Sequence, residues 1–200
     1  MRLTRPFSRA DIVRMATLLP GPFTVEMYQK LGELGIFHQD DRVELIAGQV
    51  VEMSPIGDRH AACVRRLNRL FSRYGGEVAI VDVQNPVVLG EHDAPQPDLV
   101  LLKPRPDAYP RHPHATDILL IIEVADTTLA YDRDIKMPVY ACAGIPEAWL
   151  VDLNGDAIMC YRAPGPDGYE ELATVTRGMT LRPVGLPEIR IEADEILGAC

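Results

Sequence analysis

The sequence predicts an α/β protein built on a mixed β-sheet that is flanked by helices. Two apolar runs, residues 99–102 and 117–125, have the Leu, Ile and Val content of strands that are buried on both faces. Two turn dipeptides, Ala47-Gly48 and Asn154-Gly155, each separate a pair of short apolar runs, which is the pattern of a β-hairpin. Amphipathic stretches between the strands supply the helices. One ordinary domain accounts for a chain of 200 residues.

The first expected elements are a helix and a hairpin. Residues 24–34 follow a breaker rich in Pro and Gly at residues 19–22. Their apolar side chains recur at helical intervals, at Met27, Leu31 and Leu34. Residues 42–46 and 49–53 are expected to form the two strands of the first hairpin.

A second helix is expected between about residues 58 and 74. Asp58 or a neighbour caps its start, and Gly75-Gly76 ends it. One face is apolar, and four arginines lie elsewhere on the helix: Arg65, Arg66, Arg69 and Arg73. These arginines are most simply a solvated face, although arginine is also a residue type that contacts phosphates.

The sheet and a further helix occupy the rest of the chain. We expect strands at residues 78–83, 87–89, 99–102, 117–125, 149–153, 157–162 and 169–175, the last of which covers a sheet edge. Residues 131–142 have a helical pattern that stops at Gly144. Pro138 lies inside this pattern and predicts a kink or a loosened first turn.

The composition narrows the function without deciding it. With 29 acidic and 20 basic side chains the net charge is −9, which argues against a broadly basic surface that coats DNA. A nuclease is still allowed, because carboxylates that bind Mg²⁺ add negative charge that the metal neutralises. The four cysteines have no zinc spacing and are typical of a reducing compartment. The sequence shows neither a signal peptide nor a run that could span a membrane, so we expect a cytoplasmic protein without a membrane partner.

Asp98 and Glu123 are the strongest candidates for a functional site. Asp98 stands at the start of one buried strand and Glu123 near the end of the next. If these strands pair antiparallel, the two acids meet at one edge of the sheet. Two buried carboxylates are costly unless a positive charge lies between them, and a divalent cation suits that place. The alternative is that Asp98 is a turn or capping residue and that Glu123 pairs with an arginine.

Glu44 and His60 are further candidates. Glu44 interrupts the first apolar strand of the hairpin and shares a face with Arg42 and Ile46. A solvent-facing charge on an edge strand is an equally good interpretation of Glu44. His60 opens the second helix, where an isolated histidine is more often a cap or a surface residue than a base.

Several short motifs follow one another in a fixed order. They are the hairpin at residues 43–55 with the later His60, then Pro97-Asp98, Glu123-Val124-Ala125-Asp126, Asp132 with Lys136, Tyr140, Gly144-Ile145-Pro146-Glu147 and Trp149-Leu150-Val151-Asp152. In this order they resemble the Uma-two family of restriction-type endonucleases, a branch of the PD-(D/E)XK nuclease superfamily. The resemblance covers about residues 24–162 and continues loosely to Leu197.

The resemblance implies a restriction-endonuclease-like core that hydrolyses DNA with the help of a divalent metal. The acid after proline and the acid of the (D/E)XK triplet, here Asp98 and Glu123, would bind Mg²⁺ or Mn²⁺ together with the backbone carbonyl of Val124. Glu44 would complete the shell. The resemblance also implies DNA as the partner, and a homodimer that cuts both strands.

The lysine of the superfamily triplet is absent from its usual place, because the triplet here ends in Ala125. The resemblance points instead to Lys136 on the following helix, as a migrated lysine that would position a water or stabilise charge on the phosphate. The alternative for Lys136 is an ordinary helix salt bridge with Asp132, four residues earlier.

These interpretations divide the chain into an N-terminal extension (1–23), a nuclease-like core (24–162) and a C-terminal strand and tail that pack on the core (163–200). The rival to an endonuclease is a catalytically inactive nuclease fold that serves as a binding or interaction module. The acidic balance and the missing triplet lysine favour that rival.

Overall fold

A computed structural model describes residues 21–37, 41–74 and 77–198. The predicted breaker at residues 19–22 lies partly outside these ranges, and the predicted helix end at Gly75-Gly76 lies wholly outside them. Most of the predicted N-terminal extension is outside them as well.

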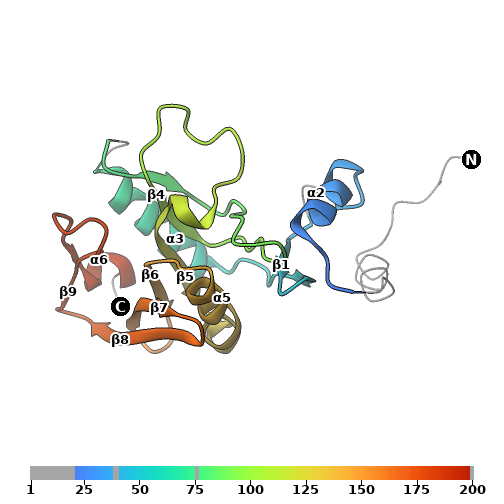
Figure 1. The fold of residues 1–200 in the computed structure, drawn as a ribbon. Coiled ribbons are helices and arrows are strands. Elements are labelled where there is room, and N and C mark those ends of the chain that lie inside the picture. Colours follow the sequence, from blue (N-terminus) through green and yellow to red (C-terminus); the bar gives the residue numbers. More distant parts are fainter. Residues whose placement is uncertain (1–20, 38–40, 75–76, 199–200) are drawn as a thin grey trace, which may run out of the picture.

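A six-stranded mixed sheet forms the centre of the molecule (Figure 1). Its strands, in spatial order, are β3 (Ile80–Asp82), β4 (Leu99–Leu102), β5 (Ile118–Ala125), β6 (Glu147–Asp152), β7 (Ala157–Gly165) and β8 (Gly168–Thr176). Neighbouring strands pair antiparallel except β5 and β6, which are parallel. A parallel pair needs a crossover connection, and a helical segment between β5 and β6 provides it.

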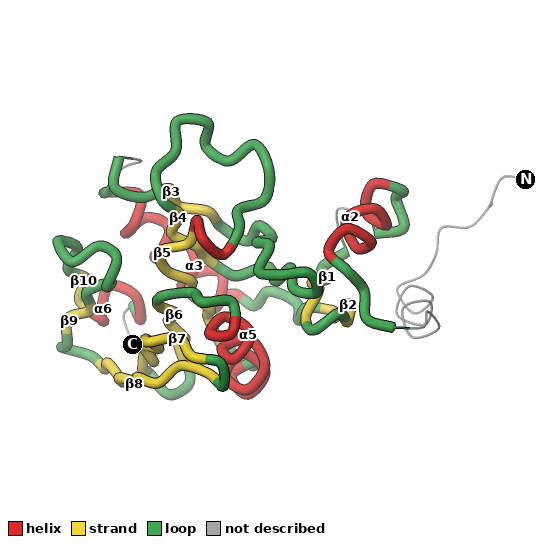
Figure 2. Tube along the Cα trace, viewed as in Figure 1, coloured by secondary structure: helices red, strands yellow, loops and turns green. Residues whose placement is uncertain are grey.

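Helices cover both faces of this sheet (Figure 2). Successive side chains of a strand point to opposite faces, so each central strand contributes side chains to two apolar clusters. Leu99 and Leu101 pack in a cluster with α3 (Asp58–Ser72) and α6 (Ala193–Leu197). Val100 and Leu102 belong to a second cluster, which contains residues of α5 (Met137–Cys142). The prediction that β4 and β5 are buried on both faces is therefore confirmed.

The N-terminal helix and hairpin form a smaller apolar cluster of their own. They are α2 (Val25–Glu33), with Thr24 as its N-cap, and the antiparallel strands β1 (Val43–Ile46) and β2 (Gln49–Glu52). Leu45 pairs with Ala94 in an isolated bridge, which ties β1 to the segment that leads into β4. This bridge brings the hairpin beside the start of β4.

The helical segment after β5 is divided into three parts, whereas the sequence predicts one helix with a kink or a loosened first turn at Pro138. It runs through α4 (Leu129–Tyr131), the π-helical turn η2 (Asp132–Lys136) and α5. The N–H of Met137 donates to the carbonyl of Asp132, five residues earlier. The π turn ends two residues before Pro138, whose ring nitrogen has no hydrogen to donate to the helix.

Gly57, the neighbour of Asp58, is the N-cap of α3, as the predicted start of this helix allows, and Asp58 is its first helical residue. One smaller prediction is wrong. Residues 87–89 form no strand, since Val88 makes only an isolated bridge with His114 in the long loop before β5.

The C-terminal part adds β8 to the sheet edge, as predicted, and continues into a short two-stranded sheet of β9 (Thr180–Leu181) and β10 (Ile191–Glu192). The 3-10 helix η1 (Ala115–Asp117) precedes β5. None of the helices within the described ranges combines the length and the apolar character needed to cross a bilayer.

Candidate active site

Asp98 and Glu123 lie side by side, as the antiparallel pairing of their strands requires. Leu99 is paired with Ile122, so the residue before Leu99 lies beside the residue after Ile122. Asp98 is 6% exposed and Glu123 is 3% exposed. The N–H of Val124 donates to Asp98 Oδ2 at 2.9 Å, which fixes one carboxylate against the strand of the other.

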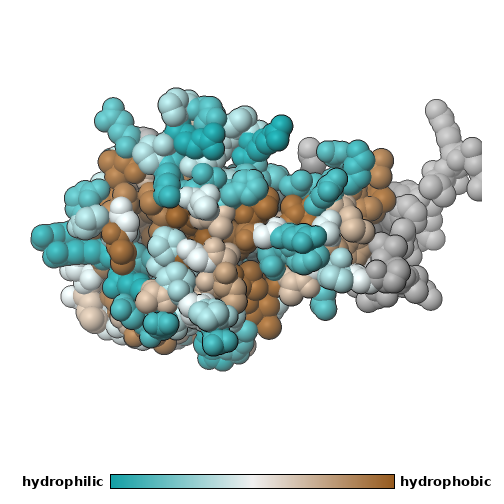
Figure 3. Space-filling model, in the orientation of Figure 1, coloured by the Kyte–Doolittle hydropathy of each residue, from teal (hydrophilic) through white to brown (hydrophobic). Residues whose placement is uncertain are grey.

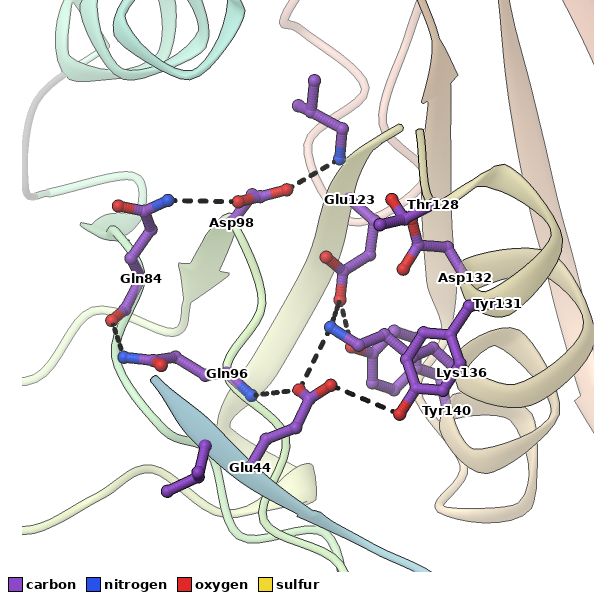
Figure 4. A network of polar contacts seen from close by, with 12 residues as sticks. Glu44, Gln84, Gln96, Asp98, Glu123, Thr128, Tyr131, Asp132, Lys136 and Tyr140 are labelled. Carbon is purple, nitrogen blue, oxygen red and sulfur yellow. Dashed lines mark hydrogen bonds and ion pairs between the residues drawn. The ribbon is translucent and has the colours of Figure 1, made fainter. Parts of the chain in front are cut away.

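Lys136 reaches this pair of acids from the π turn. Its Nζ lies 3.0 Å from Glu123 Oε1 and 3.1 Å from Glu44 Oε2, and the side chain is almost completely buried (Figure 4). The alternative, a helix salt bridge between Lys136 and Asp132, is wrong, because these two described residues form no ion pair. Asp132 instead accepts a hydrogen bond from the Thr128 hydroxyl at 2.6 Å.

Glu44 is buried in the site rather than exposed to solvent. It is 2% exposed, so its interpretation as a solvent-facing charge on an edge strand is wrong. Besides the contact with Lys136, it accepts hydrogen bonds from the Gln96 N–H at 3.1 Å and the Tyr131 hydroxyl at 3.4 Å. The β1–β2 hairpin thus contributes a carboxylate to the group formed by the sheet and the π turn.

Tyr140 is a site residue that the sequence motifs include but to which they assign no role. Its buried hydroxyl donates to Glu123 Oε1, the oxygen that also contacts Lys136. Asp132, Lys136 and Tyr140 are spaced four residues apart. A turn with i→i+5 bonds holds more residues than the 3.6 of an α-helix, so residues four apart stay close to one line. This spacing was the available signal for Tyr140.

Asp98 is held by two further side chains. His60 Nε2 lies 2.9 Å from Asp98 Oδ2, and Gln84 Nε2 donates to Asp98 Oδ1 at 3.2 Å. Gln84 has a left-handed backbone with a φ of 54°, and its carbonyl accepts a hydrogen bond from the Gln96 side chain. Gln96 in turn donates through its N–H to Glu44, so a chain of amides joins Asp98 to Glu44 (Figure 4).

The cluster lines a cavity of about 530 Å³. Residues of the hairpin, the start of α3 and the loop after β5 form its walls. Acids outnumber bases among the ionisable side chains that line it: Glu44, Glu52, Asp98, Glu123, Asp126 and Asp132 against Arg42, His60 and Lys136. A cavity of this size accommodates part of a small or extended ligand, and its charge favours a cation.

Burial raises the pKa of Glu123 to about 8, because it disfavours the charged form, and the negative Asp98 adds to the rise against the opposing effect of Lys136. Burial likewise raises the pKa of Asp132 to about 6. For Lys136, burial acts to lower the pKa, but attraction to Glu123 and Glu44 outweighs it and raises the pKa. The lysine therefore stays charged, and Glu123 binds a proton more tightly than an ordinary carboxyl group, a proton that a metal ion could replace.

The donor set fits a hard divalent cation that keeps several waters. Within the described ranges, no group of three or more His, Cys, Asp and Glu side chains is arranged to hold a metal ion. Mg²⁺ does not need such a cage, since it is often bound by one or two carboxylates, with waters and substrate oxygens as the other ligands. Asp98 and Glu123 supply two adjacent carboxylates, and Val124, whose N–H contacts Asp98, lines the same cavity.

Comparisons with known proteins agree with this fold. None of the curated proteins compared with the chain matches it. A crystal structure of "a putative nuclease belonging to DUF820 from Anabaena variabilis ATCC 29413" has a TM-score of 0.71 and 14% sequence identity. The match covers 88% of this chain and 98% of that one, so it shows the likeness of the fold and confirms the predicted restriction-endonuclease-like architecture. The model of the Uma2 family, described as "Putative restriction endonuclease", matches residues 25–194, and the chain therefore belongs to the Uma2 family.

Proposed function

We propose that this protein is a metal-dependent endonuclease that hydrolyses phosphodiester bonds of DNA. The observation that carries the proposal is the position of Lys136, whose amino group contacts Glu123 and Glu44 although the (D/E)XK triplet ends in Ala125. A charged lysine next to two carboxylates of a cavity is the arrangement that a migrated catalytic lysine needs.

Asp98 and Glu123, with the carbonyl of Val124, would hold one or two Mg²⁺ or Mn²⁺ ions. When bound, such an ion lowers the pKa of a water and neutralises charge on the phosphate. Asp98 is preset for this role, because the Val124 N–H and the side chains of His60 and Gln84 fix its orientation. Glu123 would release its proton on binding the cation, since its pKa is raised to about 8.

Lys136 would orient the attacking water or stabilise the negative charge that develops on the phosphate. Its position depends on Glu44, which holds the ammonium group from the side opposite Glu123 (Figure 4). Glu44 would therefore act mainly as a positioning residue, with Tyr131 and the Gln96 N–H fixing its carboxylate. The domain division at residues 24–162 and 163–200 and a homodimer that brings two sites to the two DNA strands belong to the same proposal.

Plasmid cleavage tests this function. Purified wild-type protein with Mg²⁺ or Mn²⁺ is expected to nick or linearise supercoiled DNA, and EDTA is expected to stop the reaction. Asp98→Ala and Lys136→Ala should each lower the rate by about 100-fold or more. Lys103→Ala is the matched control, because Lys103 is exposed in the loop at the other end of β4.

Two results would contradict the proposal. Equal cleavage by the wild type, Asp98→Ala and Lys136→Ala would identify a contaminating nuclease. No cleavage by a folded wild-type protein with either metal, across supercoiled, linear and single-stranded DNA, would favour the catalytically inactive binding module.

A further inference from the structure

The helix α3 is strongly basic in an acidic protein. Residues 58–73 contain five arginines and one acid, Asp58, whereas the whole chain has a net charge of −9. The N-terminal end of this helix reaches the proposed active site, because His60 contacts Asp98 and Gly57 lines the cavity. The basic helix α3 therefore starts at the proposed site and runs away from it.

Three of the five arginines are used inside the fold. Arg59 donates to Asp126 and Asn154 side chains and to the Leu153 carbonyl, and so ties the start of α3 to the loops around the site. Arg66 donates to the carbonyls of residues 196 and 197 in α6. Arg73 forms an ion pair with Glu195, so these three side chains have structural partners.

Arg65 and Arg69 differ from the other three. Both are exposed, and within the described ranges neither has a hydrogen bond or an ion pair with another residue. They are four residues apart on one helix, so they are neighbours on the same face, about 6 Å apart along the axis. Asn68 and Ser72 are their exposed neighbours on the helix, and the Ser72 hydroxyl donates a hydrogen bond to the Asn68 side chain. Neither neighbour is an acid that could pair with the arginines.

The rise along α3 from His60 to these arginines is short. Arg65 follows His60 by five residues and Arg69 by nine, which corresponds to a rise of about 8 and about 14 Å along the helix axis and a turn of about 140° and about 180° around it. A DNA strand advances about 3.4 Å per base pair, so a strand that leaves the site across the exposed face of α3 meets the two arginines about two to four nucleotides beyond a phosphate at the site. Two free guanidinium groups at this spacing suit the phosphates that follow the reacting one.

We propose that Arg65 and Arg69 bind the phosphodiester backbone of DNA where it leaves the active site. The proposal relies on the proposed function only for the identity of the substrate, because backbone binding requires no cleavage. It also explains how an acidic protein binds a polyanion: the positive charge is concentrated on one helix face beside the site instead of being spread over the surface.

Salt-dependent binding tests the proposal. A short fluorescein-labelled DNA duplex is titrated with the full chain in EDTA, which prevents cleavage, and its anisotropy is recorded between about 50 and about 200 mM NaCl. For the double variant Arg65→Ala/Arg69→Ala we expect affinity at least about tenfold lower and a slope of log K against log salt that is shallower by about 1.8, or about 0.9 per lost phosphate contact. Arg65→Lys/Arg69→Lys should keep the wild-type slope, since it keeps both charges.

The matched control is Arg105→Ala/Arg111→Ala. It removes the same charge from the exposed loop between β4 and β5, at the end of these strands far from Asp98 and covered by hydrophilic side chains (Figure 3). We expect near-wild-type binding for this control. Equal losses in both double variants would show a general charge effect and would overturn the proposal, as would wild-type binding by Arg65→Ala/Arg69→Ala or a wild type that does not bind the duplex.

Failure of this proposal can be told apart from failure of the proposed function. If DNA binds through Arg65 and Arg69 but the wild type never cuts, the result supports the binding surface and contradicts the endonuclease. If the wild type cuts and the double variant binds and cuts equally well, the result supports the endonuclease and contradicts the binding surface. Thermal melting of each variant confirms that these exposed substitutions leave the fold intact.

Discussion

Two buried glutamates on adjacent strands differ in almost every neighbour. Glu147, at the start of β6, is 0% exposed and its carboxylate is matched by donors. It accepts hydrogen bonds from Trp149 Nε1 at 2.9 Å, from Arg162 at 2.8 Å and from the Val184 N–H at 2.6 Å. Glu123, near the end of β5, lines a cavity and is surrounded by further acids.

The difference shows why burial alone does not identify a catalytic acid. The charge of Glu147 is neutralised by one guanidinium group and its oxygens are occupied by N–H groups, so the region around Glu147 is complete without a ligand. Around Glu123, the carboxylates of Glu44, Asp98 and Asp132 add negative charge, and Lys136 contacts Glu123 and Glu44. An excess of negative charge that opens into a cavity favours a bound cation.

Substitution of Glu123 and of Glu147 should affect DNA cleavage very differently. Glu123→Gln should lower the rate of metal-dependent DNA cleavage by about 100-fold or more, because the variant loses a charged metal ligand. Glu147→Gln should keep most of the activity of its folded fraction, since it lies outside the cavity. Plasmid cleavage normalised to folded protein measures both. Equal losses in the two variants would remove the distinction.

Stability should show the reverse order. Glu147→Ala is expected to lower the free energy of unfolding by about 3 kcal/mol or more, because it leaves the Arg162 guanidinium and two N–H groups without their acceptor. Glu123→Ala should cost less, because burial disfavours the charged form of Glu123 and Lys136 keeps its contact with Glu44. Urea unfolding of both variants measures this, and a larger loss for Glu123→Ala would contradict it.

The pH dependence of stability sharpens the comparison further. The pKa of Glu123 is raised from 4.5 to about 8, so the folded protein holds this proton more tightly than the unfolded chain. The stabilising contribution is therefore full below pH 4.5 and is lost as the pH rises to about 8. In EDTA, Glu123→Gln should gain in melting temperature relative to the wild type between about pH 5 and about pH 9. A difference in melting temperature that does not change with pH would show that the pKa of Glu123 is not raised in the folded protein.

The smallest expected effect concerns two tyrosines. Tyr140 donates a hydrogen bond to Glu123. Tyr169, which lies in the region of Glu147, donates one to the Ile145 carbonyl at 3.0 Å. Each Phe variant should lose about 1 kcal/mol of stability, the usual net value of one hydrogen bond. Only Tyr140→Phe should also lower the cleavage rate, by about tenfold, since it loosens Glu123. Unfolding and cleavage assays on the pair test this, and equal rates would exclude a positioning role for Tyr140.

The sequence predicted the sheet and the meeting of Asp98 with Glu123 because both follow from regular patterns. Two apolar runs make adjacent strands, and antiparallel pairing brings the start of one beside the end of the other. The place of Lys136 came from the family resemblance, since helical spacing alone favoured Asp132 as its partner. Pro138 predicted a disturbance, but a missing N–H can be accommodated by a kink or by a π turn, and packing decides between them.

Other contacts had no signal in the sequence. Gln84 lies in irregular chain with a left-handed backbone, where no periodicity places its side chain next to Asp98. The partners of Glu147 come from β7 and from the N–H of Val184 in a segment without regular structure. Contacts of this kind depend on tertiary packing, so the sequence could single out Glu123 by strand pairing but could not show which groups pair with Glu147.

Calorimetric titration with Mn²⁺ measures the proposed metal site without requiring cleavage. We expect the wild type to bind one or two ions, Asp98→Asn and Glu123→Gln to abolish or greatly weaken this binding, and Glu147→Gln to keep it. A wild type that binds no Mn²⁺, or binding that is unchanged in Glu123→Gln, would exclude a metal site at Asp98 and Glu123.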